Sequence, residues 1–201
     1  MKKIKRTVHR VLQSIVDHFT GNGLGQPENS PEEYGRLDQE TYGLCREAAA
    51  ESIVLLKNSG ILPLKKDKKI AVFGRCQIHS FFVGYGSGGD VHPPYKVHFL
   101  QALEEEGVQI DPKISAYYKK WCAENIPEEG WWGHWPMNYK EVLPTENMIH
   151  EAALANDAAI LVIGRAAGED RDNVLKKGSY YLTHREKILL DRITNCFSET
   201  I

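Results

Sequence analysis

The sequence predicts an α/β fold: a mainly parallel sheet with helices on both faces, layered as in flavodoxin-like and Rossmann-like domains. Three observations predict it. Two short apolar runs, residues 69–73 and 158–163, are rich in β-branched side chains, as is typical of strands buried on both faces. Each run is followed by a glycine that ends it. Segments with helical periodicity precede and follow both runs, and such alternation implies parallel connections.

The composition is that of an ordinary globular chain. The 201 residues carry a formal net charge of −2 with both signs interspersed, so nucleic acid is not an expected partner. The longest apolar run is far shorter than the roughly 20 residues that span a bilayer, so we expect no membrane segment. The basic start of the chain lacks the apolar stretch of a signal peptide, which favours a cytoplasmic protein. The four cysteines are widely spaced, so we expect neither a metal site nor disulfides. We also expect no cofactor.

The first forty residues are predicted to form a helical extension and a linker ahead of one domain at residues 41–201. From Thr7 to Phe19 the apolar residues fall on one helical face, which is expected to pack against protein. Glycines and prolines between residues 21 and 31 then end this pattern. A second helix is expected over residues 38–58, closed by Asn58-Ser59-Gly60.

The remaining regular elements follow in order. An extended bridge at residues 61–64 leads into the first strand, residues 69–74. Helices are then expected at residues 97–106, 114–123 and 148–156, with a brief strand at 108–110. After the second buried strand, the last helix opens at Thr183 with a capping-box pattern to Glu186. The chain ends where the alternation would place its next strand, so we expect a domain truncated at its C-terminal end.

A glycine-dense segment, residues 82–91, follows the first strand and includes Gly86 and Ser87. Glycine allows positive φ and lets a ligand or another backbone come close. The spacing fits neither a P-loop nor a dinucleotide-binding motif, so a turn at a pocket rim is favoured over a phosphate site.

Three of the four tryptophans lie within five residues, in a segment rich in glycine and proline that contains Trp131, Trp132 and His134. Regular structure is not expected there. Clustered indoles either pack into a small satellite core or form an apolar platform against which sugar rings stack. Both interpretations stay open, as does a role for His134 as a polar partner in such a pocket.

The stretch after the second buried strand is dense in charge and contains Arg165, Glu169 and Asp172. Ligands of open α/β sheets bind beyond the carboxyl ends of the strands, which is where Glu169 is expected to lie. Neighbouring charges could shift the pKa of its carboxyl group in either direction. The alternative is a solvated loop with internal ion pairs.

Seven short motifs occur in one order along the chain. They are REAAAESIVLLKN at 46–58, LPL at 62–64, IAVFG at 70–74, GYGSGGD at 84–90, AAILVIGR at 158–165, Gly168-Glu169-x-x-Asp172, and Tyr181-Leu182. Together they resemble the second domain of glycoside hydrolase family 3, the α/β sandwich of β-glucosidases and β-xylosidases. The resemblance runs from about Leu44 to the end of the chain.

This resemblance implies hydrolysis of β-linked glucosides or short oligosaccharides with retention, by two carboxylates. It places the acid/base on Glu169, whereas the nucleophile of the family lies in a (β/α)-barrel domain that has no counterpart here. The chain resembles the subgroup in which the sandwich precedes the barrel. Because it carries only one of the two carboxylates, we expect this chain alone to be inactive. Asp170 and Arg171 depart from common family versions. The candidate substrate-binding residues are Arg165, Asp172, Gly86, Ser87, Trp131, Trp132 and His134.

Two other classes of function stay open. A non-catalytic α/β module that binds a nucleotide or a sugar would use the glycine-dense segment instead of Glu169. A purely structural domain would dock on a barrel through an exposed apolar face.

Overall fold

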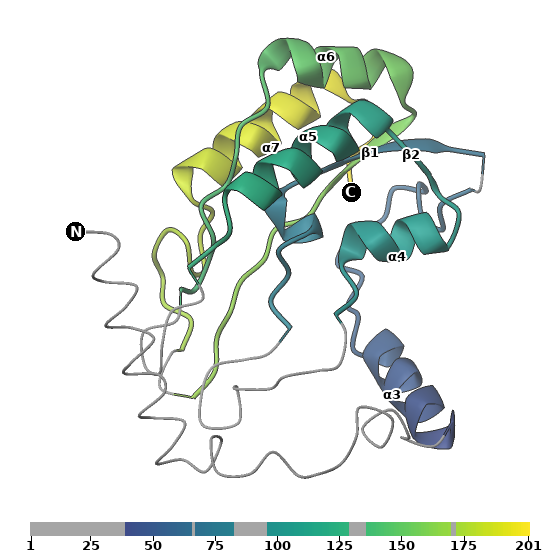
Figure 1. The fold of residues 1–201 in the computed structure, drawn as a ribbon, viewed down its shortest axis with the longest axis vertical. Helices are drawn as coiled ribbons and strands as arrows, with labels where there is room; N and C mark the ends of the chain where they lie inside the picture. The colour runs from purple at the N-terminus through teal and green to yellow at the C-terminus, as the bar shows by residue number, and fades with distance from the viewer. Residues whose placement is uncertain (1–38, 66, 83–95, 129–135, 170–171) are drawn as a thin grey trace. The chain divides into compact units, whose positions relative to one another are not determined.

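The computed structural model describes residues 39–65, 67–82, 96–128, 136–169 and 172–201 (Figure 1). The chain divides into two units, residues 1–56 and 57–201, and each is described by itself. The first unit contributes the described helix α3 (Gln39–Glu51). The described elements of the second unit are β1 (Lys69–Phe73), η1 (Arg75–Gln77), α4 (Phe99–Glu105), β2 (Gln109–Ile110), α5 (Pro112–Glu124), α6 (Glu146–Ala155), β3 (Ala158–Leu161) and α7 (His184–Cys196).

The sheet is parallel and has the strand order β2-β1-β3. The last residues of the chain extend it, because Ile201 donates its N–H to the Ala159 carbonyl and accepts from Leu161 at 2.8 Å. The resulting order is that of flavodoxin-like sheets, in which the connections from the first strand and from the next run to opposite sides. Both β1 and β3 therefore have a parallel neighbour on each side, as expected for strands buried on both faces.

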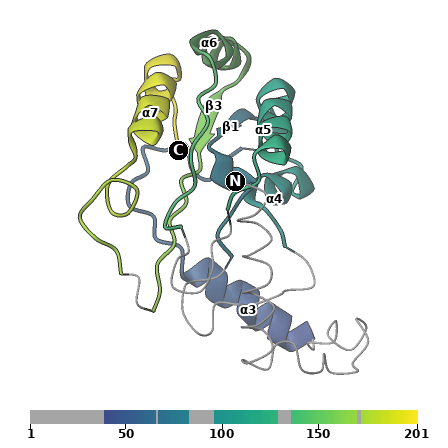
Figure 2. The same ribbon diagram turned by 60° about the vertical axis from the view of Figure 1, so that its left-hand side comes forward.

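Each face of the sheet has its own apolar cluster, because successive side chains of a strand point to opposite faces. Figure 2 shows α5, α6 and α7 side by side over one face, where they cover Ala71, Phe73 and Ala159. On the other face, α4 and the bridge residues Ile61 and Leu64 pack on the alternate side chains of β1 and β3. Helices on both faces confirm the predicted α/β sandwich.

The three helices of the first face begin at side chains that cap their free N–H groups. Asp111 accepts from the Ile114 amide before α5, with Pro112 at the first helical position, and Thr145 accepts from Met148 before α6. The predicted capping box of α7 is confirmed, with Thr183 and Glu186 each accepting the other's backbone N–H.

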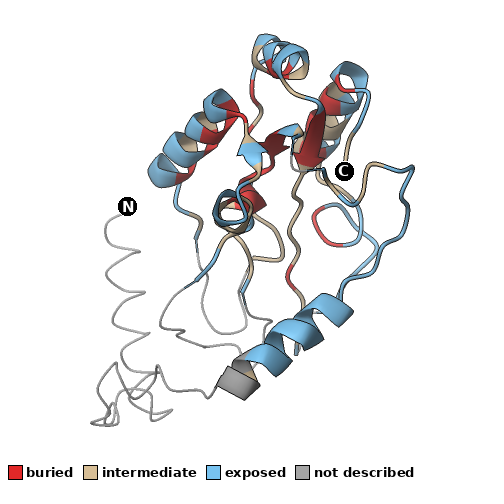
Figure 3. Ribbon diagram, turned by 90° about the vertical axis from the view of Figure 1, so that its right-hand side faces the viewer, coloured by how far each residue is buried: buried red, intermediate tan, exposed pale blue. Residues whose placement is uncertain are grey.

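The helix expected over residues 38–58 is wrong in its second half, because α3 ends at Glu51. Ile53, Val54 and their two apolar successors follow it outside any helix and are exposed. Asn58 instead closes a turn by accepting from the Gly60 and Leu62 amides. Figure 3 shows that α3 is exposed along most of its length.

Two further predicted elements are the strand at residues 158–163 and the helix from Thr7 to Phe19. The strand predicted over residues 158–163 ends at Leu161, since Val162 still donates to Phe73 but the chain then leaves the ladder. The helix predicted from Thr7 to Phe19 lies outside the described residues. Within the described ranges, no helix has the length and apolar character needed to cross a membrane.

Candidate functional site

The carboxyl ends of β1 and β3 lie side by side, at the point where the strand order reverses. Two glycines allow the chains that leave these strands to run against each other. Gly74 has φ of 90°, and a Cβ there would meet the Val162 carbonyl; a Cβ on Gly164 would meet the Cys76 sulfur and Phe81. Open α/β sheets bind ligands at this position, so we take it as the candidate site.

Arg75 follows β1 directly, and its guanidinium is almost fully buried, with 4% of the residue exposed. Its Nη2 donates to the Asn125 carbonyl at 2.6 Å and its Nη1 to the Lys140 carbonyl at 2.7 Å. The cation also lies over the Trp121 ring, 4.7 Å from its centroid. Arg75 thus holds together the two ends of the segment from residue 125 to residue 140.

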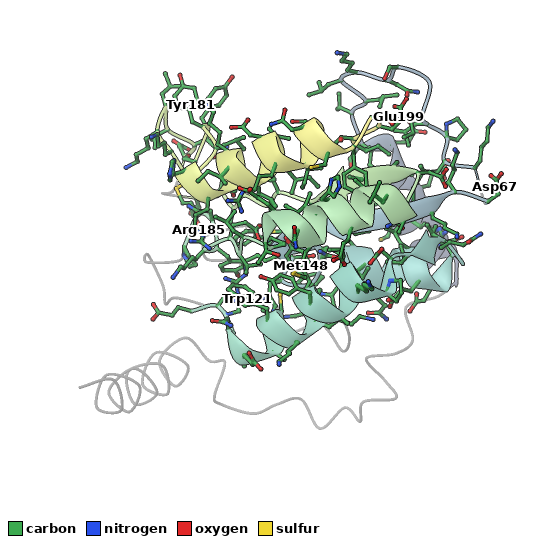
Figure 4. The ribbon with its side chains drawn as sticks, turned by 90° about the horizontal axis from the view of Figure 1, so that it is seen from above. Asp67, Trp121, Met148, Tyr181, Arg185 and Glu199 are labelled. Atoms are coloured by element: carbon green, nitrogen blue, oxygen red, sulfur yellow. The ribbon has the colours of Figure 1, made fainter. Side chains whose placement is uncertain are left out.

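A buried carboxylate lies at the same strand end. Glu141 accepts the Arg75 backbone N–H at 3.0 Å and the Val142 N–H at 2.8 Å, while Arg185 donates to its carbonyl at 2.6 Å. Burial raises the pKa of the Glu141 carboxyl to about 7, against the opposing effect of these N–H donors and of the Arg75 charge. Figure 4 shows Arg185 and Trp121 on the side of the sheet that α5, α6 and α7 cover.

The acidic loop, residues 164–173, leaves β3, and its second residue is an arginine whose side-chain N–H groups are all hydrogen-bonded. Arg165 donates from both Nη atoms to the Glu186 carboxylate, at 2.7 and 2.6 Å, and from Nε to the Ser179 carbonyl at 2.8 Å. Its remaining N–H groups reach the carbonyls of Gly164, at 2.8 Å, and Tyr181, at 3.4 Å. All five donors therefore bond to acceptors of the protein itself.

Glu186 is the partner of Arg165 and is 4% exposed. Burial raises the pKa of its carboxyl group. The hydrogen bonds from Arg165 and from the Thr183 amide, together with the charge of Arg165, lower this pKa by more, so it lies below its ordinary value. The same carboxylate caps α7 through Thr183. The pair therefore ties the start of the acidic loop to the N-terminus of a helix.

The tyrosine loop, residues 174–181, follows the acidic loop and contains hydrogen bonds between its own backbone groups. Gly178 donates to the Tyr181 carbonyl at 2.8 Å, and Asn138 donates to Gly178 at 2.7 Å. Tyr180 and Tyr181 are exposed and meet edge to face, with ring centroids 5.2 Å apart. Figure 4 shows Tyr181 beside the N-terminal end of α7.

Among the predicted site residues, Arg165, Glu169 and Asp172 lie in the described part of the acidic loop. Glu169 and Asp172 are both exposed. The other predicted residues lie outside the described residues: Gly86, Ser87, Trp131, Trp132 and His134.

Sequence reasoning missed Arg75 and Glu141 and gave Glu186 only its capping role. A cation placed directly after the glycine that ends a buried strand was a usable signal for Arg75. No local pattern points to Glu141, because its partner Arg75 is 66 residues away in the chain.

Two buried thiols, Cys76 and Cys122, lie near this edge of the sheet. Burial raises the pKa of the Cys76 thiol to about 11, and likewise that of Cys122, so both are protonated near neutral pH. Within the described ranges, no group of three His, Cys, Asp or Glu side chains is arranged to hold a metal ion.

Comparisons with known proteins agree on one family. The model of the glycosyl hydrolase family 3 C-terminal domain matches residues 53–201. The β-glucosidase of Ruminococcus albus is 38% identical over 169 residues, which cover 83% of this chain and 18% of that protein. Among solved structures, a β-glucosidase from Paenibacillus barengoltzii has a TM-score of 0.77 at 38% identity, covering 83% of this chain and 18% of its own.

A second solved structure, β-glucosidase 3B from Thermotoga neapolitana in complex with α-D-glucose, has a TM-score of 0.69 at 34% identity. The match covers 81% of this chain and 23% of that one. The chain therefore spans less than a quarter of the length of each of these relatives.

Proposed function

The chain belongs to glycosyl hydrolase family 3, and we propose that it supplies the acid/base loop of a retaining β-glucosidase-like enzyme. The observation that carries the proposal is the position of Glu169. This exposed glutamate lies on the loop that leaves β3, and β3 is one of the two strands at the strand-order reversal, where α/β sheets bind ligands.

Glu169 would have two tasks. It must be protonated to give a proton to the leaving glycosidic oxygen, and it must then act as a base toward water. In a retaining mechanism a second carboxylate attacks the sugar and forms a covalent intermediate. We propose that this nucleophile comes from a (β/α)-barrel domain outside this chain, so the chain alone does not turn over substrate.

The proposed substrate is a β-linked glucoside or short oligosaccharide. Asp172 shares the acidic loop with Glu169 and is the described candidate for a hydrogen bond to sugar hydroxyls. The remaining proposed contacts to substrate, from segments outside the described residues, are Gly86, Ser87, Trp131, Trp132 and His134.

A chimaeric enzyme tests the role of Glu169. Residues 53–201 would replace the matching segment of the Ruminococcus albus β-glucosidase, with and without Glu169→Gln, and turnover would be followed on cellobiose and on a dinitrophenyl β-glucoside. Loss of a general acid costs about 10²–10⁴ in rate. We expect such a loss of kcat on cellobiose and a smaller one on the dinitrophenyl glucoside, whose leaving group needs no proton.

Glu199→Gln, at an exposed glutamate near the chain end, is the matched control and should keep full activity in the chimaera. A fully active Glu169→Gln chimaera would contradict the proposal. The isolated chain is assayed in parallel. Turnover by it that disappears with Glu169→Gln would show that no second domain is needed.

A further inference from the structure

One guanidinium joins the bases of the acidic loop and the tyrosine loop. Arg165 lies at the start of the acidic loop, and it bonds to the carbonyls of Ser179 and Tyr181 at the end of the tyrosine loop. Through Glu186 it also bonds to the first turn of α7. Several contacts of this one side chain therefore close the base of the segment that carries Glu169, next to the backbone bond from Ala166 to the Met137 carbonyl.

From this closure we infer that Arg165 is a positioning residue, which through its pair with Glu186 fixes the loop that carries Glu169 and makes no contact with the sugar. The inference rests on the proposed function, because it takes Glu169 as the acid/base.

The geometry of the pair suits a fixed anchor. The two parallel bonds to the Glu186 carboxylate, at 2.7 and 2.6 Å, define the plane of the guanidinium as well as its position. The side chains are 19% and 5% exposed, so water competes weakly for these bonds. An exposed ion pair of the same type contributes little and would leave the loop free to move.

Glu186 is itself held in place, which makes it a firm partner. Its Oε2 accepts the Thr183 N–H at 2.7 Å, and its own N–H donates to the Thr183 hydroxyl at 3.2 Å. Because the carboxylate is fixed to the helix end, the position of Arg165 follows from that of α7. A lysine at position 165 could reach one oxygen of Glu186 but could not form the planar fork.

Direct binding of sugar by Arg165 would need a donor that is not already used. Each of its five N–H groups has a protein acceptor, so a contact with substrate would break one of these bonds. Arg165 therefore acts through the loop, and its effect should be seen on Glu169 without any substrate present.

Amide hydrogen exchange of the 201-residue chain tests this directly. The variants are Arg165→Met, Arg165→Lys and Glu186→Gln, and the control is Arg192→Met, which removes an ion pair between α7 and Glu146. We expect Arg165→Met to speed exchange of the amides of residues 174–181 about tenfold or more, by local opening. The amides of β1 should be unchanged, Lys should restore protection in part, and the control should match the wild type.

The carboxyl ¹³C resonance of Glu169 is the second readout, and it reports the position of that side chain. We expect its titration curve to change in Arg165→Met and in Glu186→Gln but not in Arg192→Met. Unchanged exchange together with an unchanged titration curve in Arg165→Met would overturn the inference.

Should Arg165→Met unfold the whole chain, Glu186→Gln decides, because glutamine keeps the shape of the side chain and its capping contact. Faster exchange confined to residues 174–181 would support the inference. Equal acceleration in β1, or none anywhere, would overturn it. Neither readout depends on activity, so this result is separate from the chimaera test of Glu169.

Discussion

Two arginines perform the same task at the carboxyl edge of the sheet. Arg75 joins the carbonyls of Asn125 and Lys140, and Arg165 joins those of Gly164, Ser179 and Tyr181. Each closes the base of a long connection between regular elements. A guanidinium suits this role because its donors point in fixed directions and it keeps its charge when it is buried.

Glu141 is the residue at this edge whose protonation should affect stability. Its pKa is about 7 in the folded chain and 4.5 ordinarily, so the folded state holds a proton that the unfolded state has already lost over this range. Stability contributed by this group is therefore lost as the pH rises from 4.5 to 7.

We expect Glu141→Gln to gain stability relative to the wild type across that window. The gain should approach about 3 kcal/mol at pH 7 and above, since each pKa unit is worth about 1.4 kcal/mol. Urea unfolding of both proteins at a series of pH values measures the difference. A difference in free energy that stays constant with pH would contradict a raised pKa for Glu141.

At the scale of elements, α7 connects the core to the acidic loop. Its Leu189 and Ile193 are buried against the sheet, while its first turn holds the Arg165–Glu186 pair. The cap at Thr183 thus stabilises the helix and also fixes Glu186, the partner of Arg165.

Removing the Thr183 hydroxyl should destabilise α7. We expect Thr183→Ala to lower the free energy of unfolding by about 1 kcal/mol, because the Glu186 amide loses its acceptor. Thr194→Ala is the matched control on the same helix. Thr194 bonds back to the Leu190 carbonyl and is exposed, so alanine there should change stability by less than about 0.5 kcal/mol. Equal effects of the two changes in urea unfolding would argue against the cap.

At the scale of the whole molecule, three helices on one face bury the larger apolar cluster. Phe73 and Phe197 meet edge to face within it, with ring centroids 5.9 Å apart. Ile149 of α6 is fully buried there, whereas Leu154 of the same helix is 77% exposed.

This contrast predicts two different costs for similar changes. We expect Ile149→Ala to lower the free energy of unfolding by about 2–5 kcal/mol, through lost burial and the cavity left behind. Leu154→Ala should cost less than about 0.5 kcal/mol, because an exposed side chain gives up few contacts. Thermal or urea unfolding separates the two. A similar loss from both variants would show that α6 is not packed on the sheet through Ile149.

The sequence alone determined the features that depend on near neighbours in the chain. The apolar run of β1 and the capping pattern at Thr183 predicted a parallel α/β sheet with helices on both faces, and the order of short motifs indicated the family. These signals are local, because strand burial and helix capping leave regular spacing in the sequence. The same locality placed Glu169 on the loop that leaves β3.

Only the tertiary structure decided how distant residues pair. It paired Arg165 with Glu186, 21 residues further along the chain. It also ended α3 at Glu51, whereas the sequence pattern predicted a helix as far as residue 58. Hydrogen bonds between residues far apart in the chain leave no periodic trace in the sequence, so the contacts of Arg75, Glu141 and Arg165 became visible only in the fold.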